Sequence, residues 1–349
     1  MSVVPESAPN KDDVKAALEA SSAQAQAQAR RTALIRTGLA LGALVAVVVV
    51  VNVFSHGSFL TATNLTNVLR QITFNAILAV GQTFVIITAG IDLSVGSLIE
   101  LTGVVMATFA NAMPFDGVPL VLATLIVGLL VGCFAGFVNA VPVVRLNLPP
   151  FITTLAMMLM ARGLAFKLSH GRPVALTSSA FDTIGTGFFL KIPVAVLWMA
   201  VIVAVFAILL TRTRFGRYVF AIGGNEEAAR LAGINVRFVK TMVYVISGGC
   251  AAVSGLLLMA RFSSGSPQTG IGSELQSIAA VVVGGTSLMG GRGSVIATFL
   301  GALLIGLLNN AMNLLEIESY TQDIVLGAVI LIAVVIDELR KRYLRGAAG

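Results

Sequence analysis

The run VPLVLATLIVGLLVGCFAGFVNAV, residues 118–141, decides the class of fold. It holds 24 consecutive residues without a charged side chain. Because an α-helix rises about 1.5 Å per residue, roughly 20 apolar residues cross a hydrocarbon core about 30 Å thick. This segment is therefore predicted to span a membrane as a helix.

Similar apolar segments recur along the whole chain. They predict an all-α polytopic membrane protein with about ten transmembrane or re-entrant helices, at 36–54, 68–88, 95–113, 118–141, 151–169, 192–211, 239–260, 275–288, 295–315 and 324–336. The eighth segment is short and leads into glycine-rich sequence. We therefore predict a half-helix or re-entrant element there, which is tolerated only where protein or a water-filled cavity surrounds it.

The composition of all 349 residues agrees with a membrane protein. Hydrophobic residues make up 57%, charged residues 11%, and the mean hydropathy is +0.94. Soluble proteins carry about 25% charged residues. A compact soluble domain has too little interior to bury this apolar excess, so a soluble nucleic-acid-binding protein is excluded despite the net charge of +7.

Basic residues indicate the topology. They follow the fourth, sixth, eighth and tenth segments: Arg145; Arg212, Arg214, Arg217, Arg230, Arg237 and Lys240; Arg292; and Arg340, Lys341, Arg342 and Arg345. Because cytoplasmic loops are enriched in Lys and Arg, both termini are predicted to be cytoplasmic. The predicted organisation is a flexible tail over 1–35, a transmembrane domain over 36–337 and a basic tail over 338–349.

The sequence offers no recognisable catalytic or metal motif. Cys133 and Cys250 lie in apolar runs, and His56 and His170 are far apart in sequence. No Gly-Lys pair is present, so the phosphate-binding pattern G-x-x-x-x-G-K-[ST] is absent. The chain is predicted not to be an enzyme, and to bind no metal or cofactor itself.

A charged loop over 212–238 contains signals for a short helix. Asn225 is a favourable N-cap, Glu226 and Glu227 suit the positive end of a helix, and Gly233 is a natural stop. About two helical turns are not stable alone in water. The helix therefore needs a partner surface, either on another protein or on its own chain, and Ala228, Ala229, Leu231 and Ala232 offer small or apolar side chains for it.

Four motifs occur in a recognisable order: GIDLSVGS at 90–97, LPPFITTLAMMLMARGLA at 148–165, AIGGNEEAARLAGINV at 221–236 and VVVGGTSLMGGRGS at 281–294. Over residues 60–336 the chain resembles the membrane permeases of ribose-type bacterial ABC importers. The resemblance implies an inner-membrane subunit that forms the path of a monosaccharide (ribose-, xylose- or galactose-like) or a polyol.

The resemblance also implies partners. These are a second permease copy in a homodimer, ABC ATPase subunits that bind ATP and Mg²⁺, an extracytoplasmic sugar-binding protein, and membrane lipid. The short loop helix resembles the coupling helix, which carries the motion of the ATPase into the membrane. The residues assigned to this ATPase contact are Gly223, Gly224, Asn225, Glu226, Glu227, Ala229 and Gly233.

Polar residues near the membrane core are candidates for the translocation path. Asp92, with Ser94 beside it, is either a gate along the path or a cap on the following helix. Gln71, Asn75 and Gln82 share one helical face, as do Asn309 and Asn313. Thr153 and Thr286 stand near prolines or glycines that break helices. These side chains either line the path or form hydrogen bonds between helices.

Two further questions stay open at the level of sequence. An ion-coupled secondary transporter is the alternative function, with Asp92, Glu100 and Asp323 as proton carriers. The similarity of residues 80–83 (VGQT) to 283–286 (VGGT) is too short to establish an internal duplication.

Overall fold

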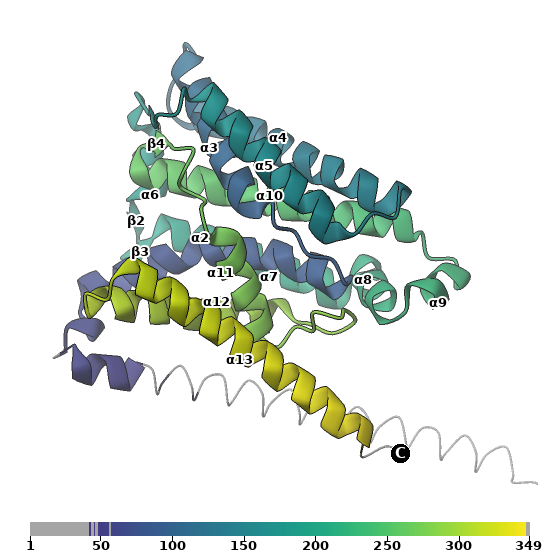
Figure 1. Ribbon diagram of the computed structural model, residues 1–349. Coiled ribbons are helices and arrows are strands. Elements are labelled where there is room, and N and C mark those ends of the chain that lie inside the picture. The colour runs from purple at the N-terminus through teal and green to yellow at the C-terminus, as the bar shows by residue number, and fades with distance from the viewer. Residues whose placement is uncertain (1–41, 43–44, 46–47, 56, 347–349) are drawn as a thin grey trace, which may run out of the picture. The chain divides into compact units, whose positions relative to one another are not determined.

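The computed structural model describes residues 42, 45, 48–55 and 57–346. The predicted tail over 1–35, most of the first predicted segment and the last three residues lie outside the described residues. Residues 1–46 and 47–349 form separate units, and the fold below is that of the second unit. Its described residues are mostly helical, as predicted (Figure 1).

Seven helices of the described part are long and apolar enough to cross a membrane. They are α2 (Ala62–Ile87), α3 (Val95–Ala112), α4 (Val118–Arg145), α5 (Pro150–Leu168), α7 (Val194–Arg212), α10 (Val236–Phe262) and α12 (Val295–Leu314). Shorter apolar stretches form α11 (Ser273–Val283) and the first part of α13 (Ser319–Gly346). The all-α polytopic class is confirmed, while the number of ten spans stays a prediction.

Local signals set the ends of these helices. The Thr61 side chain accepts a hydrogen bond from the Asn64 N–H and caps α2, and Ser294 caps α12 in the same way. Proline occupies the first turn of both α4 and α5, where no N–H is needed. The last helix continues through Gly346, beyond the predicted end at 336, because no proline or glycine interrupts the intervening residues.

Helices α2 and α10 form the centre of the bundle. Their most apolar 18-residue windows are 83% and 78% buried, against 22–28% for α4, α5 and α7. The two run antiparallel, because Gly81 lies against Ser247 whereas the Phe74 carbonyl accepts from Ser254. The outer helices expose large apolar side chains such as Leu130 and Val201, as lipid-facing surfaces do.

Two helices begin after short non-helical segments, which we call breaks. Residues 88–94 separate α2 from α3, and residues 266–272 precede α11. The break before α11 packs on the first turn of α3, since a Cβ on Gly270 would lie 2.0 Å from the Gly96 carbonyl oxygen. Helix α11 spans only 11 residues, which confirms the predicted short element.

The helix contacts reveal an inverted repeat. Helix α3 packs on α4, α5 and α10, while α11 packs on α12, α13 and α2. Likewise α4 packs on α10 and α12 packs on α2. Because α2 and α10 run in opposite directions, the groups α2–α5 and α10–α13 are related by inversion, an arrangement common among transporters. This repeat pairs α2 with α10 and α3 with α11, so residues 80–83 on α2 and 283–286 at the end of α11 are not equivalent positions, and their four-residue similarity is not part of it.

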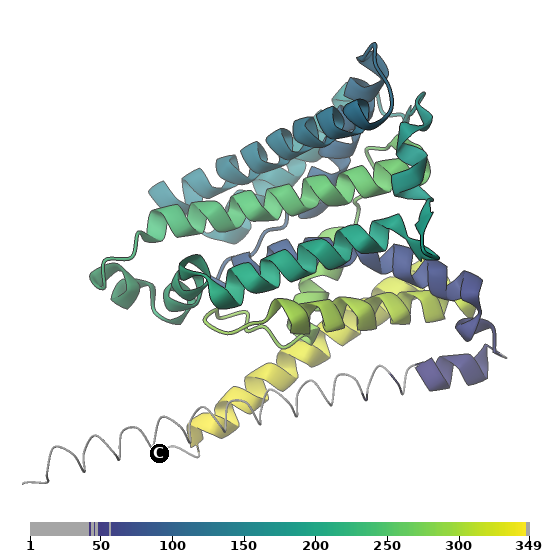
Figure 2. The same cartoon turned by 180° about the vertical axis from the view of Figure 1, so that it is seen from behind.

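Short elements gather in the connections (Figures 1 and 2). The strands β2 and β3 lie at one end of the bundle, and α8 and α9 at the other. Strand pairing is antiparallel, with Val174 opposite Gly265 and Phe188 opposite Pro193. The sequence patterns did not predict these strands. The elements are η1 (Ser58–Leu60), β1 (Val174–Ala175), η2 (Ser179–Phe181), α6 (Asp182–Gly185), β2 (Phe188–Phe189), β3 (Ile192–Pro193), α8 (Arg214–Gly224), α9 (Glu226–Leu231) and β4 (Ser264–Gly265).

Candidate functional site

The predicted short helix is present as α9. The Asn225 side chain accepts a hydrogen bond from the Ala228 N–H at 3.0 Å and caps its start. At its end Gly233 has φ +80° and donates to the Arg230 carbonyl, and Ile234 donates to the Ala229 carbonyl. This pair of bonds is a Schellman motif, so both predicted boundary signals are confirmed.

A second helix, α8, precedes α9 and was not predicted. Thr213 caps its start by accepting from the Gly216 N–H at 3.2 Å. Gly223 and Gly224 are the last two residues of α8, so they do not belong to α9. Gly223 lies tightly against α2, since a Cβ there would come within 1.7 Å of the Ile87 carbonyl oxygen, whereas Gly224 faces open space.

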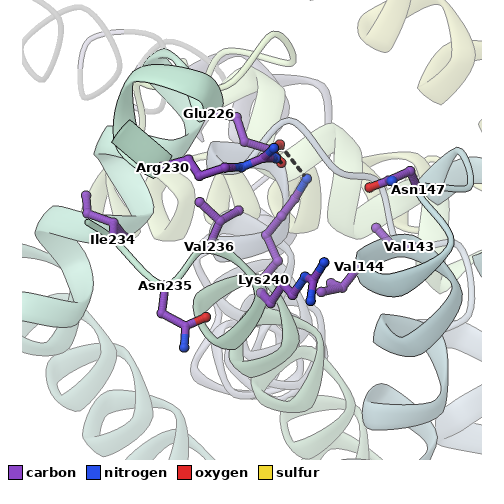
Figure 3. A pocket seen from close by; sticks show the side chains of 10 residues that line it. Val143, Val144, Asn147, Glu226, Arg230, Ile234, Asn235, Val236 and Lys240 are labelled. Carbon is purple, nitrogen blue, oxygen red and sulfur yellow. Dashed lines mark hydrogen bonds and ion pairs between the residues drawn. The ribbon is translucent and has the colours of Figure 1, made fainter. Parts of the chain in front are cut away.

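An ion pair holds α9 on its own chain (Figure 3). Lys240 of α10 lies 2.8 Å from Glu226, and Arg230 lies 3.4 Å from both Glu226 and Glu227. A cavity of about 300 Å³ separates α9 from the start of α10 and the end of α4. Lys240 thus ties α9 to a membrane helix.

The two faces of α9 differ in exposure. Ala229 is buried, so this predicted contact residue packs inside the chain instead of facing a partner. Glu227 and Arg230 are exposed, and Leu231 exposes 82% of its surface. The structure therefore combines both readings of this loop: one face of α9 packs on its own chain, and the other offers a charged rim around a large apolar side chain.

Asp92 lies at the centre of a buried polar cluster in the break before α3. Its carboxylate accepts hydrogen bonds from the Ser94 N–H and hydroxyl and, at 2.8 Å, from Ser247 of α10. Asn139 of α4 donates to the Ser94 hydroxyl at 2.8 Å, and Gln82 of α2 donates to the Asp92 backbone carbonyl at 2.8 Å. These hydrogen bonds hold the break before α3 against α2, α4 and α10.

The sequence left two roles for Asp92, a gate along the path or a cap on α3, and the structure bears on the second. Ser94 is the N-cap residue of α3, yet its side chain makes no capping bond. Asp92 instead bonds the N–H of Ser94 itself, so it shapes the turn before the helix. A role as a gate stays a prediction.

The other candidate path residues do not form one site. Asn75 donates to Gln276 of α11 at 2.8 Å, and Asn313 accepts from Gln322 of α13 at 2.8 Å. These bonds join helices, as the structural alternative predicted. The remaining candidates are distributed along the fold: Gln71 half-buried on α2, Thr153 bonded to the Pro149 carbonyl, Thr286 buried in the loop between α11 and α12, and Asn309 buried on α12. Contact with substrate stays a prediction for all of them.

Several polar contacts were not predicted. Ser247, Asn139 and Gln276 complete the pairs above, and Asn64 of α2 exchanges two amide hydrogen bonds of 3.0 Å with Asn310 of α12. Their only sequence signal is an isolated polar residue in an apolar run. Such a signal identifies a membrane-buried hydrogen bond without naming its partner.

The proposed proton carriers of the ion-coupled alternative are not grouped. Glu100 of α3 forms a salt bridge of 3.1 Å with Arg162 of α5, and Asp323 is exposed on α13. Asp92 belongs to the separate cluster in the break. Among the described residues, no group of three or more His, Cys, Asp or Glu side chains is placed to hold a metal ion.

Comparison with known proteins identifies the relatives of this chain. Residues 64–334 match the family model described as branched-chain amino acid transport system / permease component. The ribose import permease of Haemophilus influenzae is 45% identical, covering 86% of this chain and 92% of that permease. The Escherichia coli ribose import permease is 43% identical with the same coverage, and the E. coli D-allose permease is 36% identical over 85% of this chain and 90% of its own length. No solved structure matches.

Proposed function

Because this chain belongs to the family of branched-chain-type transport permeases and is the multi-pass permease subunit of a bacterial inner-membrane ABC sugar importer, we propose that it carries ribose. The observation that supports ribose is the 45% identity to a ribose import permease along almost the entire length of that protein. Identity to the D-allose permease is lower, at 36%. Other monosaccharides, and polyols, are therefore secondary candidates.

We further propose that the α8–α9 end of the bundle faces the cytoplasm. Five basic residues lie between the start of α8 and the first turns of α10: Arg214, Arg217, Arg230, Arg237 and Lys240. Cytoplasmic loops retain such residues, which supports this orientation and the predicted cytoplasmic location of both termini. A sugar-binding protein would then deliver its cargo at the β2–β3 end.

We propose that α9 receives the ATPase subunit, which binds ATP and Mg²⁺. The exposed face of α9 supports this role, because an apolar side chain, Leu231, surrounded by the charged Glu227 and Arg230 matches the apolar centre and polar rim of protein interfaces. The bond from Lys240 to Glu226 then transmits movement of α9 to α10. Since α10 pairs with α2 at the centre of the fold, the movement reaches both halves of the inverted repeat. A second copy of the permease completes the path as a homodimer.

Charge reversal tests this assignment. Replacing Glu226→Lys and Glu227→Lys should abolish ATP-driven uptake, because the new charges repel Lys240 and Arg230 and remove the acidic rim. A matched reversal, Glu316→Lys with Glu318→Lys, changes two exposed acidic residues between α12 and α13 and should leave ATPase association intact. Normal uptake with normal ATPase association in the α9 variant would refute the coupling role.

The ion-coupled alternative gains no support. The relatives named above are import permeases, and the acidic side chains that this mechanism requires lie on separate elements.

A further inference from the structure

Three segments that are far apart in the sequence meet at one carbonyl group, that of Ile87 at the end of α2. Gly291, in the loop between α11 and α12, donates its N–H to this carbonyl at 2.9 Å. Gly223 of α8 approaches the same oxygen so closely that a Cβ would lie 1.7 Å away. A Cβ on Gly291 would in turn lie 3.0 Å from the Gly224 Cα. The α11–α12 loop is thus packed against the end of α8.

This loop, residues 285–293, is well ordered by its own contacts, and we call it the junction loop. Gly285, Gly290 and Gly291 all have positive φ, between +72° and +85°, which glycine adopts without strain. Ser287 donates to the Arg292 carbonyl at 3.0 Å, and the Gly290 N–H donates back to the Ser287 carbonyl at 3.0 Å. These bonds close a compact turn.

The tip of the junction loop carries an apolar side chain away from the fold. Met289 exposes 74% of its surface, while Thr286 and Ser287 beside it are buried. A methionine is flexible and polarisable and adapts to irregular pockets on partner proteins. Methionine is also enriched in protein–protein interfaces relative to the rest of the surface, so this turn is suited to contact a partner.

We propose that the junction loop is a second contact with the ATPase subunit, next to the contact made by α9. This inference rests on the proposed function of α9. Both surfaces lie at the same end of the bundle, where the loop runs beside α8 in both views (Figures 1 and 2). Leu231 and Met289 are both exposed, and the Gly223–Gly224 end of α8, which packs on the junction loop, leads directly into α9.

A protein partner fits this surface better than lipid does. A segment that lies in the membrane interface needs a broad apolar face along a helix. The junction loop is a glycine-rich turn whose apolar anchor is one methionine, with the exposed Arg292 beside it.

The second contact places both halves of the inverted repeat within reach of the ATPase. The junction loop follows α11 and leads into α12. Through Ile87 it also touches α2, whose next residues form the break before α3. Movement of the loop would therefore act on both helices that begin after breaks, α3 and α11.

Site-directed cross-linking tests the proposal. In a chain whose Cys133 and Cys250 are replaced by alanine and whose uptake is intact, single cysteines M289C, L231C and L190C are labelled with a photoreactive maleimide in the assembled complex. Leu190 is the matched control, because it is 82% exposed like Leu231 but lies in the β2–β3 turn at the opposite end.

We expect a cross-linked band with the ATPase from M289C and L231C and none from L190C. A band from L231C without one from M289C, or a lipid adduct at M289C, would overturn the second contact and leave the role of α9 intact. If neither cysteine cross-links to the ATPase, both assignments fail. A band from M289C alone would support the junction loop and contradict the contact by α9.

Discussion

Substituting one of two adjacent glycines should uncouple transport, whereas the other should tolerate the same change. In Gly223→Ala the new Cβ would lie 1.7 Å from the Ile87 carbonyl oxygen and 2.5 Å from the Gly291 nitrogen. An ordinary contact begins at 3.4 Å, so α8 must withdraw by about 1.7 Å. Gly224→Ala meets no atom within 4 Å.

The displacement can be expressed as a free energy. Overpacking against rigid backbone costs about 1–3 kcal/mol, and loss of the Gly291 hydrogen bond adds about 1 kcal/mol. The sum of about 2–4 kcal/mol lowers the ratio of seated to displaced α8 by a factor of roughly 30 to several hundred. Gly224→Ala should instead gain up to about 1 kcal/mol of helix propensity.

The assay compares ATP-driven ribose uptake, ATPase co-purification and thermal unfolding of the two variants. We expect Gly223→Ala to lose most of its uptake while Gly224→Ala retains the parental rate. The unfolding temperature distinguishes a local displacement from global misfolding, because a displaced α8 leaves the α2–α10 pair intact. Equal uptake by the two variants would refute the role of this junction.

Three further substitutions probe the fold and the site. Gly132→Ala places a Cβ 2.3 Å from the Gly248 carbonyl oxygen. The overpacking costs about 1–3 kcal/mol, so the unfolding temperature should fall. Gly163→Ala meets no atom within 4 Å and is the control, and equal unfolding temperatures for the two variants would contradict the packing. Lys240→Met removes an ion pair of about 1 kcal/mol and should speed hydrogen exchange in α9 about fivefold, whereas unchanged exchange would show that the pair does not hold α9. Ser247→Ala removes a donor from a buried carboxylate, so chemical denaturation should show a loss of about 1–3 kcal/mol, and a neutral effect would contradict the bond.

Local signals in the sequence predicted much of the fold. Long apolar runs located the spans, and Asn225 and Gly233 set the boundaries of α9, because caps depend only on residues a few positions apart. The break at Asp92 was marked by an ionisable residue between glycines. Its principal partner on α10, Ser247, lies 155 residues further along the chain, so no local pattern could name it.

Long-range packing explains what the sequence did not reveal. Gly223 and Gly224 look alike in the sequence, yet only Gly223 lies against the end of α2. Ala229 looked suited to a partner because it is small and apolar, and the same properties bury it inside the chain. The inverted repeat shows in which helices pack together, and contacts between helices far apart in the sequence are not marked by any local pattern.

The most direct measurement is uptake of labelled ribose into vesicles that contain this permease with its ATPase and its sugar-binding protein. We predict uptake that requires ATP on the face bearing α9, stops with vanadate and continues in the presence of a protonophore. Uptake that proceeds without ATP and is abolished by the protonophore would contradict the assignment of this chain as the permease of an ATP-driven importer.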